Sequence, residues 1–176
     1  LLTALLLVTV GNALRSRTPT GEPISGLRLA YQIAVGIGLH NLGEGLAIGS
    51  AFALGETALG VFLIVGFTLH NVTEGVGIAA PVVKEQRPSL WHFIGLAAVA
   101  GAPAIIGTWI GAFTYSALWT TVFLAIGIGA IAQVIWEVGR LIQRSQARAG
   151  EPLFTWNTLG GITAGIAVMY GTALLV

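Results

Sequence analysis

Residues 29–54 read LAYQIAVGIGLHNLGEGLAIGSAFAL, an apolar run in which Glu44 is the sole charged residue. A helix that crosses a bilayer needs ~20 residues of this kind. Similar runs occupy about 58–83, 91–115, 117–139 and 154–176, and a shorter run covers 1–14. The sequence therefore predicts an all-α, polytopic transmembrane helical bundle with five full spans and one partial span.

The composition is typical of a membrane protein rather than of a water-soluble globule. Of 176 residues, 55% are hydrophobic and 9% are charged, and the mean hydropathy is +0.87. An ordinary soluble domain has roughly 25% charged residues. The net charge of +1 gives no reason to expect a nucleic-acid partner. The chain has no Cys, so His, carboxylate and amide groups are its available metal ligands.

Basic residues alternate between the ends of the predicted spans. All eight Lys and Arg residues fall in or beside three connections, at about 15–28, 84–90 and 140–153. Because basic residues are retained in cytoplasmic connections, these three are expected to face the cytoplasm and the C-terminus to face outward. Trp91 and Trp156 fall at inner boundaries and Trp119 at an outer one, as expected for aromatic rings at a membrane interface. We expect a single multi-pass domain over residues 1–176, with the lipid bilayer as its surroundings.

A hexapeptide motif occurs twice at similar depth in neighbouring spans. Residues 40–45 read HNLGEG and residues 70–75 read HNVTEG. On a helix, residues four apart differ by about 40° and about 6 Å of rise, so the His and Glu of each motif share a face. Each Asn lies at the edge of that face. The two motifs thus predict a polar cluster between two adjacent helices.

The two motif carboxylates need a partner at the centre of the membrane. A charge there costs at least ~2.5–3.5 kcal/mol, and no Lys or Arg lies at matching depth. A bound cation, a proton on each carboxyl group or a water-filled path could meet this cost. Two imidazoles and two carboxylates form a set suited to Zn²⁺ and tolerable to Fe²⁺, Mn²⁺, Co²⁺ or Cd²⁺. We expect the metal ligands to be His40, Glu44, His70 and Glu74, with Asn41 and Asn71 completing or orienting the shell.

Other polar residues in the spans carry weaker signals. Glu137, with Gln133 one turn earlier, lies toward the inner end of its run and could form an access or exit site for cations. Ion pairing of Glu137 with Arg140 or Arg144 is the alternative. His92 lies beside Trp91 at an inner boundary, where an interfacial role competes with a ligand role.

Small residues at four-residue spacing predict close helix packing. The pairs are Gly45/Gly49, Gly107/Gly111 and Gly161/Gly165. In lipid, such pairs let helix backbones approach each other.

Over residues 36–83, the two motifs resemble the paired signature of the ZIP (Zrt/Irt-like) metal transporters. Helices four and five of that family carry His-Asn-x-Pro-Glu-Gly-like motifs around a transport site. The resemblance, particularly to bacterial GufA-like members, implies a zinc transporter of a bacterial inner membrane rather than an enzyme. It implies uptake toward the cytoplasm, with Zn²⁺ as bound substrate, by helices that move against a more static group. It also implies that the chain runs from the end of the third helix to the eighth, with the upstream helices missing.

Three departures from the family pattern concern the site. Gly43 and Thr73 replace the two motif prolines, and Ala102-Pro103 replaces a Glu-Pro pair found in many relatives. Asn71 stands where some relatives have Asp. With fewer carboxylates available, we expect one tightly held metal ion rather than a binuclear centre.

Two other classes of protein remain open. Carboxylates and histidines on helices also build di-iron enzymes, although such centres use about four carboxylates. A membrane sensor that binds metal without moving it is the second class. A homodimer is one assembly that the sequence allows. The residues rank none of the candidate metal ions above the others, because selectivity depends on geometry.

Overall fold

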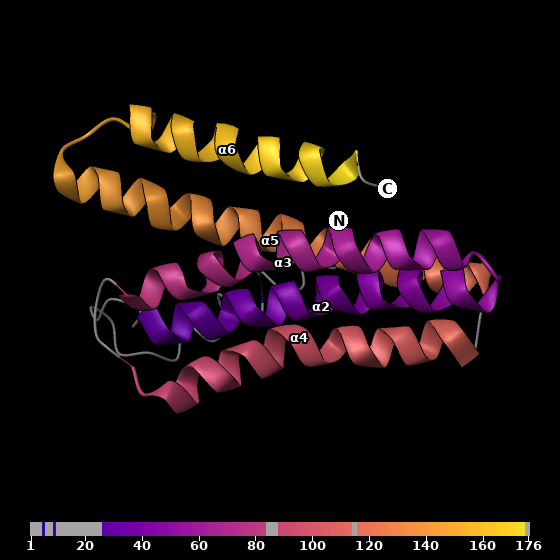
Figure 1. The fold of residues 1–176 in the computed structure, drawn as a ribbon. Helices are drawn as coiled ribbons and strands as arrows, with labels where there is room; N and C mark the ends of the chain where they lie inside the picture. Colours follow the sequence, from indigo (N-terminus) through magenta and orange to yellow (C-terminus); the bar gives the residue numbers. More distant parts are fainter. Residues whose placement is uncertain (1–4, 6–8, 10–25, 84–87, 114–115, 175–176) are drawn as a thin grey trace.

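The computed structural model describes residues 26–83, 88–113 and 116–174, with Leu5 and Thr9 as isolated positions. Its elements in these ranges are helices, as Figure 1 shows. They are α2 (Gly26–Ala53), α3 (Thr57–Val83), α4 (Leu90–Phe113), α5 (Ala117–Ala149) and α6 (Trp156–Ala173). The predicted all-α membrane bundle is confirmed. The predicted partial span at 1–14 lies outside the described ranges.

The helix boundaries follow the apolar runs except at the end of α5. This helix continues to Ala149, through a polar stretch that was assigned to a connection. No Gly or Pro interrupts residues 140–149, so nothing in the local sequence stops the helix. It ends at Gly150, whose φ of 68° is left-handed and whose N–H donates to the Ala147 carbonyl.

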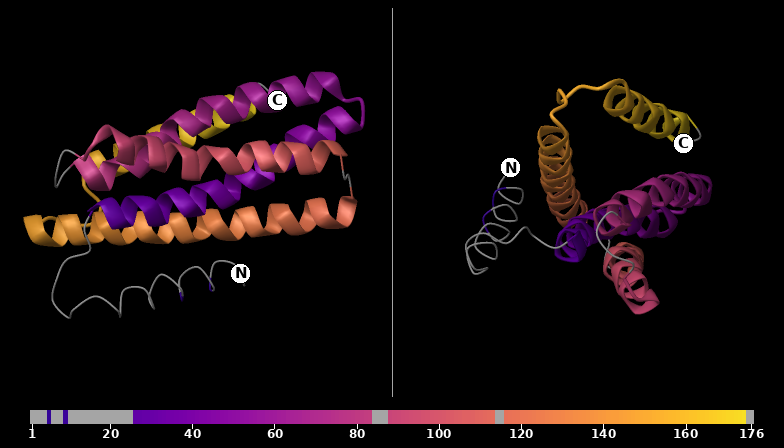
Figure 2. Two further views of the ribbon diagram at one scale, coloured as in Figure 1. Left: turned by 90° about the horizontal axis from the view of Figure 1, so that it is seen from below. Right: turned by 90° about the vertical axis from the view of Figure 1, so that its left-hand side faces the viewer.

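Helix α2 lies at the centre of the bundle. It packs most extensively against α4 and also contacts α3 and α5, while α6 contacts α3. Figure 2 shows α2 between these neighbours when the bundle is seen end-on. The first motif therefore lies on the helix with the most neighbours.

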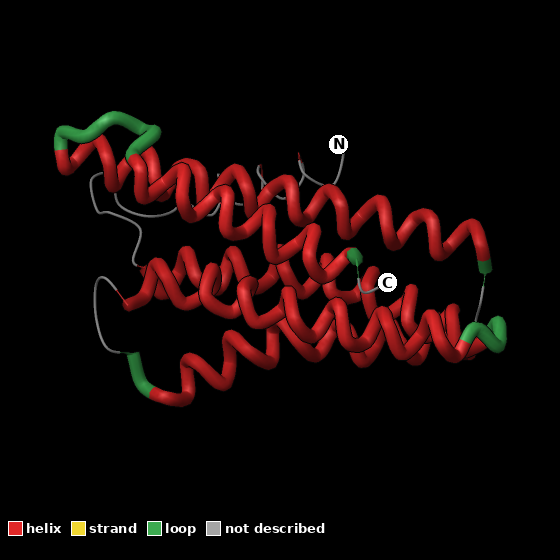
Figure 3. The backbone as a smooth tube through the Cα atoms, turned by 45° about the horizontal axis from the view of Figure 1, so that its top comes forward, coloured by secondary structure: helices red, strands yellow, loops and turns green. Residues whose placement is uncertain are grey.

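The connections alternate between the two ends of the bundle. Figure 3 shows the α2–α3 and α4–α5 connections at one end and the α3–α4 and α5–α6 connections at the other. The second end carries Arg28 at the start of α2 and Arg140, Arg144 and Arg148 in the last turns of α5. We call it the basic end. The other four basic residues lie outside the described ranges.

Three of the described helices are long and apolar enough to cross a membrane: α3, α4 and residues 118–149 of α5. Helix α2 has 28 residues, about 42 Å of length, but His40, Asn41 and Glu44 lower its mean hydropathy. Helix α6 has 18 residues, about 27 Å. The helix that carries the first motif is thus the one that its neighbours cover best.

Glycine contacts bring α2 and α4 together in the half of the bundle away from the basic end. Gly45 and Gly49 of α2 face backbone atoms of α4, and Gly107 and Gly111 of α4 face backbone atoms of α2. A Cβ at any of these four positions would lie closer than 3.0 Å to the partner backbone. We call these contacts the glycine seam. Two of the three predicted pairs thus mediate helix packing, whereas the Gly161/Gly165 pair has no atom within 4 Å of where a Cβ would lie.

An apolar core fills the other half of the bundle, toward the basic end. Its buried side chains come from α2, α3 and α4: Ala30, Ile33, Ala34, Ile37, Ile78, Val82, Leu96 and Ala100. Pro103, inside α4, lacks the N–H that would pair with the Val99 carbonyl, and this carbonyl lies against Gly38 of α2. The seam and the core together fix α2 against α4.

Candidate metal site

Both motifs lie within uninterrupted helix. Helix α2 is continuous through residues 40–45 and α3 through residues 70–75, although glycines flank both carboxylates. The Thr73 hydroxyl donates to the His70 carbonyl at 2.6 Å, one turn earlier. Thr73, at the position of a family proline, is thus accommodated without breaking the helix.

Three side chains of the two motifs meet between α2 and α3. One ligand atom from each of His40, Glu44 and His70 lies within 4.8 Å of the others. Glu44 Oε1 is 3.2 Å from His40 Nε2 and 2.5 Å from His70 Nε2. The side chains of Glu44 and His70 are 7% and 8% exposed, whereas His40 is 27% exposed. A single carboxylate oxygen therefore lies between two imidazoles, with His40 nearest to the surface.

The spacing of these atoms is close to that of a first coordination shell. Bond lengths of about 2.0–2.2 Å to His and carboxylate place tetrahedral ligand atoms about 3.3 Å apart. The separation of 3.2 Å between Glu44 and His40 already matches this value. An ion with these bond lengths would fit if the distance between His70 Nε2 and Glu44 Oε1 increased from 2.5 Å to about 3.3 Å.

The two motif asparagines tie the cluster to the surrounding helices. Asn41 Nδ2 donates to Asn71 Oδ1 at 2.9 Å and to the Ala100 carbonyl of α4 at 3.0 Å. Asn71 Nδ2 donates to the Phe67 carbonyl at 2.7 Å and to Glu44 Oε2 at 3.3 Å. These bonds fix the Glu44 carboxylate from α3 and link the site to α4. In this arrangement the amides orient the ligands.

Glu74 lies beside the group of three rather than in it. It is half-buried, and Glu44, His40 and His70 are all within its electrostatic range. Its Oε2 is buried and has no hydrogen-bond partner among the described residues, and the same holds for Asn41 Oδ1. Two oxygen acceptors are thus available at the edge of the cluster, which is the chemistry a cation would complete.

Three residues with weaker sequence signals for a metal site, Gln133, Glu137 and His92, lie away from this cluster. Gln133 and Glu137 of α5 are 5% and 4% exposed, and Gln133 faces α2 at Gly36. His92 of α4 instead contacts Tyr31 of α2, with 3.4 Å between the hydroxyl and Nδ1. The structure therefore places His92 at the basic end of the α2–α4 contact, not among the ligands.

Two polar residues of α2 were not predicted: Ser50, which is 6% exposed and whose Oγ has no hydrogen-bond partner among the described residues, and the half-buried Gln32. Both amide atoms of Gln32 on α2 are buried without a hydrogen-bond partner among the described residues. Its signal in the sequence is weak, a single amide in an apolar run. Phe67 was also missed, and its ring lies 5.4 Å from that of His70, forming an apolar wall of the site.

Comparison with known proteins gives one match. A family model described as ZIP Zinc transporter matches residues 14–134, which include both motifs, the glycine seam and Gln133. No curated protein and no solved structure matches the chain.

Proposed function

This chain belongs to the ZIP zinc transporter family, and from that membership we propose that it is part of a transporter that moves a divalent transition-metal ion, which we take to be Zn²⁺, toward the cytoplasm. The family match covers more than half of the chain, and a His/Glu cluster that could hold a metal lies within it. Membership also argues against an enzyme, since the family consists of transporters.

The observation that carries this proposal is the meeting of His40, Glu44 and His70 within 4.8 Å. The three ligands come from two different helices, so an ion bound there would be held by side chains distant in the sequence. A hydrogen-bond network alone would leave the buried Glu74 Oε2 and Asn41 Oδ1 without partners. An ion that Glu74 joins as a fourth ligand would give Glu74 Oε2 a partner.

The chemistry of the ligands suits transport. An ion must shed water to enter the site and must leave it again, so its ligands should bind without trapping it. Imidazole and carboxylate groups bind Zn²⁺ well and also accept Fe²⁺, Mn²⁺, Co²⁺ and Cd²⁺. The ligand set supports a divalent transition metal, and we favour zinc because the family model is that of zinc transporters.

The basic end of the bundle identifies the cytoplasmic side, toward which we propose that the ion moves. By the positive-inside rule this end faces the cytoplasm, which puts the C-terminus outside. Gln133 and Glu137 extend from the level of the cluster toward this end, because Gly127 of α5 faces His40 and Gln133 faces Gly36. From Gly127 to Glu137 the rise is about 15 Å. We infer that the two buried α5 side chains line the cytoplasmic part of the ion path.

The packing of α2 supports movement of one helical group against another. The glycine seam joins α2 and α4 by backbone contacts that leave no room for a Cβ. Against α5 the backbones lie farther apart, since a Cβ at Gly127 would lie 3.5 Å from the His40 backbone and a Cβ at Gly36 would lie 3.5 Å from the Ala130 carbonyl oxygen. The tight contacts of Gly36 are with the side chains of Val134 and Gln133. Helices α2 and α4 would therefore move together, and the interface with α5 is the one that could slide.

The test is uptake of radioactive zinc by the full-length protein in proteoliposomes, with equilibrium zinc binding measured on the same preparations. Variants Glu44→Gln and Glu74→Gln keep the size of the side chain and remove its charge. Glu56→Gln is the matched control, because Glu56 is exposed in the turn between α2 and α3. We expect saturable uptake by the wild type and by Glu56→Gln, and uptake near background for the other two.

The combined readouts separate the competing functions. Zinc binding without uptake would identify a sensor. Neither binding nor uptake by the wild type would leave the cluster as a hydrogen-bond network, and a bound di-iron centre without metal uptake would favour the enzyme.

A further inference from the structure

We propose that Pro103 of α4 is a positioning residue of the metal site. It frees backbone carbonyls of α4 that hold Asn41 and, through Asn71, the Glu44 carboxylate. The inference rests on the proposed function, because it concerns how the ligands of that site are oriented. Proline offers no ligand atom of its own, so Pro103 acts through these other residues.

The proline makes one turn of α4 available to a neighbouring helix. Pro103 lies inside α4, which continues from Leu90 to Phe113. Because proline has no backbone N–H, the Val99 carbonyl, four residues earlier, lacks its helical donor. The proline ring also crowds this carbonyl and weakens the helix around it. The next carbonyl, that of Ala100, belongs to the same weakened turn.

Both carbonyls are turned toward α2. A Cβ at Gly38 would lie closer than 3.0 Å to the Val99 carbonyl oxygen and 3.2 Å from Cγ of Pro103. Asn41 Nδ2 donates to the Ala100 carbonyl at 3.0 Å. Gly38 and Asn41 are three residues apart and so share a face of α2. One residue of α2 thus leaves room for the first carbonyl, and the other binds the second.

From Asn41, hydrogen bonds continue to the Glu44 carboxylate. Asn41 Nδ2 also donates to Asn71 Oδ1 at 2.9 Å, and Asn71 Nδ2 donates to Glu44 Oε2 at 3.3 Å. Asn41 is 2% exposed and Glu44 is 6% exposed, so bulk water does not compete for these bonds. A displacement of the Ala100 carbonyl would therefore turn the Asn41 amide and, with it, the carboxylate.

This arrangement accounts for the pair Ala102-Pro103. The chain keeps the proline of the Glu-Pro pair found in many relatives and lacks its carboxylate. Ala102 has no ligand atom to offer. Helix α4 therefore acts on the site through its backbone, and the proline is the residue that makes this backbone available.

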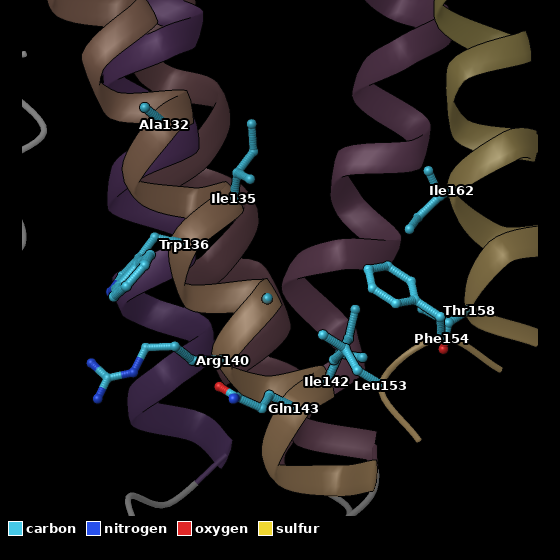
Figure 4. A pocket seen from close by; sticks show the side chains of 11 residues that line it. Ala132, Ile135, Trp136, Arg140, Ile142, Gln143, Leu153, Phe154, Thr158 and Ile162 are labelled. Atoms are coloured by element: carbon cyan, nitrogen blue, oxygen red, sulfur yellow. The ribbon is translucent and has the colours of Figure 1, made fainter. Parts of the chain in front are cut away.

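The side-chain hydrogen bonds of the two motif asparagines involve α2, α3 and α4, and none of those described involves α5 or α6. Helix α5 meets the cluster at Gly127, where a Cβ would lie 3.5 Å from His40. The cavity of about 430 Å³ that Figure 4 shows is lined by α5, α6 and their connection, and by no residue of the motifs. The support for the two amides thus comes from α4.

The experiment is a double-mutant cycle of Asn41→Ala and Pro103→Ala in the full-length protein, read by equilibrium zinc binding. Pro103→Ala should weaken zinc binding about tenfold, as expected for a residue that orients metal ligands. In the Asn41→Ala background the same change should have less than about a twofold further effect, because the two residues act in one chain of contacts. Pro81→Ala is the matched control, since Pro81 is a buried proline inside α3, and it should leave the affinity unchanged.

Bound Co²⁺ gives a second readout, because its visible absorption depends on coordination geometry. The spectrum should change in the same way in Pro103→Ala and in Asn41→Ala, and it should stay as in the wild type in Pro81→Ala. A general loss of stability would lower the amount of bound Co²⁺ without altering the spectrum of the bound fraction.

Three outcomes would overturn the positioning role: additive losses of zinc affinity in the double variant, an unchanged Co²⁺ spectrum in Pro103→Ala, or an equal loss of affinity in Pro81→Ala. Absence of zinc binding by the wild type would refute the proposed function instead. The same cycle read by thermal unfolding would then decide the inference. Non-additive shifts of Tm would support the link between Pro103 and Asn41, and additive shifts would overturn it.

Discussion

The glycine seam makes a quantitative prediction at Gly45. A Cβ at this position would lie closer than 3.0 Å to the backbone of Ala104 on α4. Because the obstacle is backbone rather than a flexible side chain, α2 and α4 must separate to admit the methyl group. Overpacking of this kind costs about 1–3 kcal/mol.

The matched control is Gly101→Ala on the same pair of helices. Gly101 has no atom within 4 Å of where a Cβ would lie, so the substitution removes a helical glycine without a clash. Replacing such a glycine by Ala stabilises a helix by up to about 1 kcal/mol. Both variants gain this propensity, and only Gly45→Ala suffers the clash. The two should therefore differ by about 1–3 kcal/mol, the cost of overpacking.

Thermal unfolding of the full-length protein in detergent measures the difference. At about 2–4 °C per kcal/mol for a chain of this size, the Tm of Gly45→Ala should lie roughly 2–12 °C below that of Gly101→Ala. Zinc binding should weaken as well, because Glu44 precedes Gly45 and would move with it. An equal or higher Tm for Gly45→Ala would refute the close α2–α4 contact.

Further predictions concern the site and its neighbours. Asn41→Ala should weaken zinc binding by about 10–100-fold in an equilibrium titration, because it removes the bond to the Ala100 carbonyl that positions the motif; unchanged affinity would show that Asn41 is not needed. Gly127→Ala should leave the Tm within a few degrees of wild type, since its Cβ would meet His40 at 3.5 Å, an ordinary contact; a large loss would mean that α5 packs as tightly as α4. Zinc occupancy should fall between about pH 7 and about pH 5, because imidazole and carboxylate ligands must lose their protons to bind metal; a dye-competition titration showing constant affinity would contradict this. Gln146→Ala should speed amide hydrogen exchange at the start of α6 by at least roughly fivefold, because it removes the hydrogen bonds to the Thr155 and Thr158 hydroxyls, each worth about 1 kcal/mol, whereas unchanged exchange would show that the turn is held otherwise.

The helices could be predicted from the sequence because the bilayer sets the length of an apolar run. The ends of the helices were harder to predict, as α5 shows. Its polar last turns contain no helix breaker before Gly150, so polarity marks the membrane boundary there and not the end of the helix. The apolar pattern shows which residues lie in the membrane, but it does not show where the helix ends.

The site was predictable in part. Four-residue spacing within each motif places His40 with Glu44, and the repeat of the motif brings in His70. The position of Glu74 could not be predicted, because it depends on how far α3 is rotated about its axis relative to α2. The Ala100 carbonyl was missed for a similar reason, since its bond to Asn41 follows from helix pairing rather than from a motif. Whether the clustered side chains hold a metal stays a prediction.

The central position of α2 has a consequence for biogenesis. Its polar motif makes it the least favourable span to place in lipid, since a charge at mid-membrane adds about 2.5–3.5 kcal/mol to the cost of insertion. Helices α3 and α4 are more apolar over their length, although α3 carries Glu74 of the second motif. The helix that covers α2 most, α4, begins 37 residues after α2 ends, so α2 lacks its main partner until that stretch has been synthesised. A ribosome that stalls within this interval would leave α2 without its partners, so the first motif is also the part of the chain most exposed to quality control during synthesis.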